Sequence, residues 1–67
     1  MEREEAIDVI ETLFPADSDN PLTKQTGERL LKQAKKEVQG WRTEPTNVLV
    51  RYASLCIKEE NRPGKAL

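Results

Sequence analysis

A group of acidic side chains between residues 17 and 28 is the first candidate for chemistry, because carboxylates at fixed spacing can bind a cation. Asp17, Asp19 and Glu28 match the first, third and twelfth positions of a calcium-binding EF-hand loop. That loop also needs an oxygen ligand at its fifth position and a glycine at its sixth, where this chain has Pro21 and Leu22. We therefore expect no metal here and interpret the segment as a loop that caps a helix.

The single cysteine is a second candidate, because a thiolate can act as a nucleophile. Cys56 falls in the apolar sector of a predicted helix over residues 45–61, and the sequence contains no histidine that could activate it. Free cysteine is among the residues most often buried, so we interpret Cys56 as a core residue. One cysteine without histidine also excludes an internal disulfide and a zinc site of the Cys/His kind. No glycine-rich phosphate loop is present, so we expect no enzyme activity and no cofactor.

Five cations on a predicted helix over residues 22–39 give an informative binding signal. They fall within about 140° of one helical face, opposite an apolar stripe. The five are Lys24, Arg29, Lys32, Lys35 and Lys36. Two interpretations are open: a solvated face that nearby acids partly neutralise, or a contact surface for an acidic protein or for phosphate.

The junction over residues 39–43 supports a different hypothesis, since a short turn containing glycine also joins the two helices of a helix-turn-helix. In that interpretation the helix over residues 45–61 enters the major groove of DNA. Thr46, Asn47 and Arg51 then reach the base edges. The wide apolar sector of this helix and the acidic first third of the chain argue against it. DNA binding is therefore the alternative rather than the main hypothesis.

Prolines and a glycine divide the chain into three segments that must position these side chains. The predicted helices cover residues 2–14, 22–39 and 45–61. Pro15 ends the first apolar pattern because it lacks an N–H group and disfavours helix at the residue before it. Asn20 or Thr23 is expected to cap the second helix, and Gly40 is the natural residue to close it.

The third predicted helix has an apolar sector of about 200°, which is wider than one neighbouring helix covers. We therefore expect an all-α, three-helix bundle with helix 3 at its centre. Val50 and Ile57, at one edge of the sector, are predicted to face outward and contact another chain. The predicted core consists of Ile7, Ile10, Leu13, Phe14, Leu30, Leu31, Ala34, Val38, Trp41, Val48, Leu49, Tyr52, Leu55 and Cys56.

Length and charge indicate the number of domains and the cellular location. The 67 residues allow one domain, which we predict over residues 1–62, followed by a disordered tail over residues 63–67. The formal net charge is only −1, yet residues 1–20 carry seven acids and one base, and residues 21–42 carry six bases and two acids. We expect these two segments to attract each other. The first residues are charged and no long apolar run is present, so we expect a cytoplasmic protein without membrane contact.

These observations favour a small, non-catalytic module for protein–protein interaction, acting as an adaptor, inhibitor or regulatory subunit through its helical surfaces. The expected partner is another protein or a second copy of the chain, which would form a homodimer. Nucleic acid is the less favoured partner.

Overall fold

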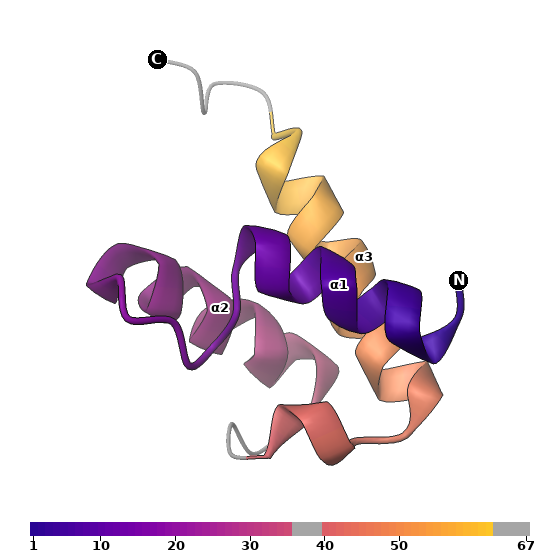
Figure 1. The fold of residues 1–67 in the computed structure, drawn as a ribbon. Coiled ribbons are helices and arrows are strands. Elements are labelled where there is room, and N and C mark those ends of the chain that lie inside the picture. The colour runs from indigo at the N-terminus through magenta and orange to yellow at the C-terminus, as the bar shows by residue number, and fades with distance from the viewer. Residues whose placement is uncertain (36–39, 63–67) are drawn as a thin grey trace.

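Three α-helices form the structure, a computed structural model that describes residues 1–35 and 40–62. Their bounds are Arg3–Leu13 for α1, Pro21–Ala34 for α2 and Thr46–Glu60 for α3, and a 3-10 helix, η1, covers Trp41–Thr43. Both α1 and α2 pack against α3, whereas they contact each other little (Figure 1). The predicted all-α, three-helix bundle with helix 3 at its centre is therefore confirmed.

The first helix follows the sequence pattern and is one residue shorter at each end than predicted. Glu4 and Glu5 lie in its first turn, where carboxylates interact favourably with the positive end of the helix dipole. Ala6 and Ile10 are completely buried and form its contact with the core. Arg3 connects its first turn to the segment before α3, because the guanidinium donates to the carbonyl oxygens of residues 42 and 44.

The start of α2 shows the predicted cap. The side-chain oxygen of Asn20 accepts hydrogen bonds from the main-chain N–H groups of Leu22 at 2.9 Å and Thr23 at 3.3 Å. Pro21 occupies the first helical position, where its missing N–H group leaves no partner unsatisfied.

The end of α2 differs from the prediction. The helix ends at Ala34, and Lys35 is extended with φ −156° and ψ 166°, so the predicted helix is interrupted at Lys35. Residues 36–39, which include the predicted contact residue Lys36 and the predicted core residue Val38, lie outside the described residues. Gly40 adopts the left-handed conformation expected of a capping glycine, with φ 66°, but it begins η1 instead of following α2 directly.

The core combines side chains from all three helices, η1 and the loop after α1. Its buried members are Ala6, Ile10, Ala16, Leu30, Leu31, Trp41, Leu49, Tyr52, Ala53 and Cys56. Five predicted core residues pack against this cluster while partly buried: Ile7, Leu13, Phe14, Ala34 and Leu55. Val48 is also only half-buried. Three buried alanines, Ala6, Ala16 and Ala53, were not in the predicted core, whose only alanine was Ala34.

A close approach explains the glycine in the middle of α2. Gly27 is buried against the chain segment that follows α1. A Cβ atom at this position would lie 2.8 Å from the carbonyl carbon of Pro15 and 2.9 Å from the nitrogen of Ala16, and it would overlap the carbonyl oxygen of Phe14. Glycine therefore allows α2 to pack directly on this segment.

Candidate interaction surfaces

The expected attraction between residues 1–20 and residues 21–42 is present, and Arg42 of η1 supplies its base. The ion pairs seen among the described residues do not join α1 to α2. Arg42 contacts Glu11 of α1 at 2.8 Å and Asp17 of the following loop at 2.5 Å. The helix α2 contributes no base to these two pairs, because it packs on α3 beside α1 rather than against α1.

Around Arg42 the contacts form a small cluster, which we call the Arg42 cluster and define as Glu11, Asp17, Trp41 and Arg42. The guanidinium lies 4.3 Å from the centre of the Trp41 ring, a cation–π contact. The indole N–H of Trp41 donates to Asp17 Oδ1 at 3.3 Å. On its other side the Trp41 ring meets the Tyr52 ring edge-to-face, with centroids 5.5 Å apart.

Hydrogen bonds within the Arg42 cluster stabilise the charged forms of the Asp17 carboxyl and the Arg42 guanidinium. The hydrogen bond from Arg42 lowers the pKa of the Asp17 carboxyl below its usual 3.8, while partial burial opposes this shift. The same hydrogen bond, together with that to Glu11, raises the pKa of the Arg42 guanidinium. The cluster therefore binds the connecting segment to α1, and we assign it a structural role.

The predicted basic face of α2 is divided between structural and exposed cations. Lys35 is largely buried and pairs with Glu44 at 2.7 Å, with side chains 12% and 26% exposed. Arg29 is half exposed and pairs with Glu59 of α3 at 3.2 Å. Lys24 and Lys32 are exposed, and no ion pair of either is seen among the described residues.

A groove between α2 and the C-terminal half of α3 extends this basic surface. It has a volume of about 420 Å³ and is lined by Arg29, Leu30, Gln33, Leu55, Lys58, Glu59, Asn61 and Arg62, which we call the basic groove. Leu30 and Leu55 supply its apolar part. The single acid, Glu59, lies between two bases, at 3.2 Å from Arg29 and 3.8 Å from Arg62.

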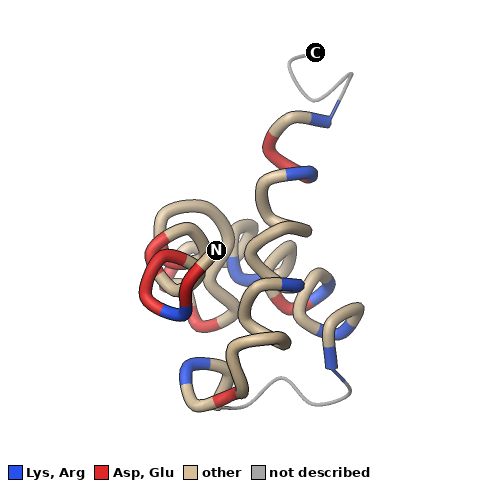
Figure 2. Tube along the Cα trace, turned by 90° about the vertical axis from the view of Figure 1, so that its right-hand side faces the viewer, with Lys and Arg blue, Asp and Glu red and all other residues tan. Residues whose placement is uncertain are grey.

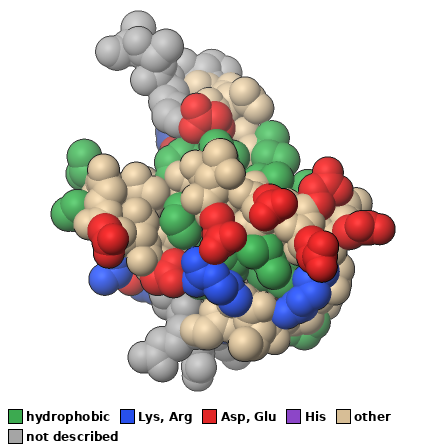
Figure 3. Space-filling model, in the orientation of Figure 1, with side chains coloured by type: hydrophobic (Ala, Val, Ile, Leu, Met, Phe, Trp, Pro, Cys, Tyr) green, Lys and Arg blue, Asp and Glu red, His purple; other side chains and the backbone are tan. Residues whose placement is uncertain are grey.

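A second groove lies between α1 and α3. It has a volume of about 300 Å³ and is lined by Asp8, Val9, Thr12, Leu13 and Ile57, which we call the acidic groove. Figure 3 shows hydrophobic side chains exposed among acidic ones on this side of the molecule. Of the two residues predicted to face outward from α3, Ile57 is 38% exposed in this groove, whereas Val50 is half-buried against the core.

The short turn that a helix-turn-helix requires is not found between α2 and α3. Residues 35–45 separate α2 from α3, and this connection includes η1, whereas the DNA-binding motif joins its helices by a turn of about three to four residues. Thr46, Asn47 and Arg51 are nevertheless exposed in the first half of α3. DNA binding through these three side chains stays a prediction.

The cysteine and the acidic side chains were the other candidates for chemistry. Cys56 is completely buried, and burial raises the pKa of its thiol to about 12, against the smaller opposing effect of a hydrogen bond with the Phe14 backbone. Over residues 1–35 and 40–62, no group of three or more His, Cys, Asp or Glu side chains is arranged to hold a metal ion. None of the helices in this part of the chain combines the length and apolar character needed to cross a bilayer.

Comparisons with protein-family models, with curated proteins and with solved structures found no significant match to the chain. The functional argument therefore rests on the surfaces described above.

Proposed function

We propose that the chain is a small, non-catalytic interaction module that binds an acidic, amphipathic segment of a partner protein in the basic groove. The observation that supports this proposal is the combination of an apolar floor with a cationic rim. Leu55 is partly exposed between the two helices, Leu30 lines the same groove although it is only 3% exposed, and Arg29, Lys58 and Arg62 surround them. An amphipathic helix recognises such a groove by placing its apolar residues on the floor.

Charge favours an acidic partner over a basic one. The groove lining carries three bases against the single acid Glu59, which two of the bases already neutralise. Lys32 lies one helical turn beyond Arg29 on α2 and adds a further exposed cation beside the groove. Complementary charge of this kind accelerates association and selects the correct partner.

Binding of a synthetic probe tests the proposal. The probe is a helical peptide with leucine at positions i, i+4 and i+7 and glutamate on its remaining face, and its fluorescence anisotropy reports binding. Lys58→Glu should weaken binding about tenfold, because it reverses a charge at the groove. Arg51→Glu is the matched control, since Arg51 is an exposed cation on α3 outside the groove lining, and its binding should match the wild type.

Two results would contradict the proposal: no binding of the acidic probe at low salt, or equal weakening by both substitutions. A gel-retardation assay with duplex DNA addresses the alternative. Retardation by the wild type that is lost in Arg51→Glu but kept in Lys58→Glu would instead favour DNA binding through the start of α3.

A further inference from the structure

The outer face of α2 carries an exposed apolar side chain together with two cations. Leu22 is 76% exposed at the start of the helix, the largest exposed fraction among the large hydrophobic residues that the structure describes. Gln25, Arg29 and Lys32 follow it at intervals of three, seven and ten residues and are also exposed, so the four share one side of the helix. We call these four residues the α2 ridge. Figure 2 shows most lysine and arginine positions on α2 and α3 and a cluster of acidic positions on α1, which also carries Arg3.

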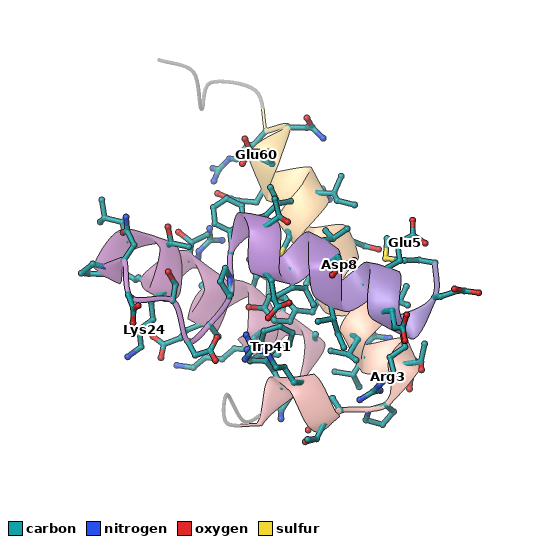
Figure 4. The ribbon with its side chains drawn as sticks, viewed as in Figure 1. Arg3, Glu5, Asp8, Lys24, Trp41 and Glu60 are labelled. Carbon is teal, nitrogen blue, oxygen red and sulfur yellow. The ribbon has the colours of Figure 1, made fainter. Side chains whose placement is uncertain are left out.

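On the other side of the molecule, the acidic groove carries the opposite charge. Asp8 lines it, and Glu5 lies one helical turn earlier on α1 and is exposed. Glu60 is exposed one turn beyond Ile57 on α3, and Figure 4 shows Glu5 and Asp8 along α1 with Glu60 on the part of α3 that extends past it. The described lining of this groove contains no base.

The α2 ridge and the acidic groove face different directions. The basic groove, between α2 and α3, contains Leu55, and the acidic groove, between α1 and α3, contains Ile57. Leu55 and Ile57 are two positions apart, so their side chains point about 200° apart around the axis of α3. The α1 side and the α2 side of α3 therefore lie nearly opposite, and one molecule cannot place its own ridge in its own groove.

The spacing of the two surfaces matches. At a rise of about 1.5 Å per residue, Leu22 and Arg29 are separated by about 10.5 Å along the ridge, and Leu13 and Glu5 by about 12 Å along α1. A ridge placed in the groove with Leu22 on Leu13 therefore brings Arg29 close to the acids at the start of α1. Apolar contact and ion pairing are then satisfied together.

We propose that the α2 ridge of one copy of this chain binds the acidic groove of a second copy. The contact joins two different surfaces, so each bound copy still presents a free ridge and a free groove, and association continues head-to-tail. The near-neutral net charge of −1 offers little general repulsion against it. Arg29 belongs to both the α2 ridge and the basic groove, but self-association through the ridge does not require the basic groove to bind a partner.

Sedimentation of two charge-reversed variants, alone and mixed, tests the proposal. Lys32→Glu alters the ridge, and Glu5→Lys/Asp8→Lys alters the groove; all three positions are exposed, and circular dichroism checks that helical content is unchanged. The wild type should increase steadily in average mass over about a hundredfold range of concentration, and each variant alone should stay monomeric. An equimolar mixture should associate again, because the intact ridge of one variant meets the intact groove of the other and the reversed ridge meets the reversed groove with opposite charge.

Matched controls are Lys24→Glu and Glu4→Lys, which reverse exposed charges outside the ridge and outside the lining of the groove and should associate like the wild type. A wild type that remains monomeric throughout would overturn the proposal. So would an oligomer that persists in both variants. Association lost in each variant and not restored by mixing would show a symmetric contact instead. None of these results depends on the acidic probe peptide, so failure here is distinguishable from failure of the proposed function.

Discussion

The hydroxyl of Tyr52 in α3 donates a 2.6 Å hydrogen bond to the main-chain carbonyl oxygen of Phe14, the residue that follows α1. Tyr52 has no exposed surface, and burial raises the pKa of its hydroxyl, so the group remains protonated as a donor. Through this bond the central helix fixes the point at which the chain leaves α1.

Tyr52→Phe is expected to destabilise the fold by about 1–3 kcal/mol, because it removes a buried donor while keeping the ring in place. Urea unfolding followed by circular dichroism measures the loss. The edge-to-face contact with Trp41 should survive, so near-ultraviolet circular dichroism of the folded variant should resemble that of the wild type. Equal stability of the two proteins would show that the hydrogen bond contributes nothing.

Gly27→Ala separates helix propensity from packing. Propensity alone predicts that alanine stabilises an internal helical position by about 1 kcal/mol. The Cβ atom would overlap the main chain of residues 14–16, so we expect destabilisation by about 1–3 kcal/mol instead. Gln25→Ala, at an exposed position of α2, is the control and should change the melting temperature little. A more stable Gly27→Ala variant would contradict the close approach.

Acid should weaken the Arg42 cluster. Because the folded-state pKa of Asp17 lies below its usual value of 3.8, its stabilising contribution is complete above that value and is lost as the pH falls below it. Asp17→Asn should therefore be less stable than the wild type at neutral pH, with the difference shrinking in acid. Asp19→Asn, in the same exposed loop, is the control, because no ion pair of Asp19 is seen among the described residues. Unfolding curves at neutral and acidic pH that differ by the same amount for Asp17→Asn would argue against this pairing.

Cys56 should be unreactive in the folded protein. Its burial and its pKa of about 12 keep the thiol neutral and shielded from reagents. Modification by a thiol reagent should be slow in buffer, fast in denaturant, and limited by unfolding in between. The raised pKa also implies that its stabilising contribution is lost as the pH rises from about 9 towards 12, since the unfolded thiol ionises first. Rapid modification under native conditions would show that the core opens around α3.

The helices that the sequence predicts well are those whose signals are local. Pro15 stops α1, Asn20 and Pro21 start α2, and the wide apolar sector of α3 places it at the centre. Each of these three features follows from neighbouring residues or from one periodic pattern, and none of them requires knowledge of distant contacts.

The features that the sequence did not predict depend on distant partners. The apolar pattern and Gly40 favoured a second helix to residue 39, but Trp41 is buried against Tyr52 and Lys35 pairs with Glu44, which set the path of the connection. The acidic groove likewise required the structure, because Val9 and Leu13 become neighbours of Ile57 only when α1 packs on α3. The predicted contact residue Ile57 belongs to it, whereas Val50 does not line it.

The side chain of Arg3 spans the chain's first turn and the segment before α3, donating to the carbonyl oxygens of Glu44 at 2.5 Å and Arg42 at 2.7 Å. These contacts join residues that are 41 and 39 positions apart, so the first turn of α1 and the segment before α3 stabilise each other. Amide hydrogens at the start of α1 and in η1 should therefore exchange with solvent together. A tag fused before Met1 that displaces this turn would loosen the segment before α3 as well.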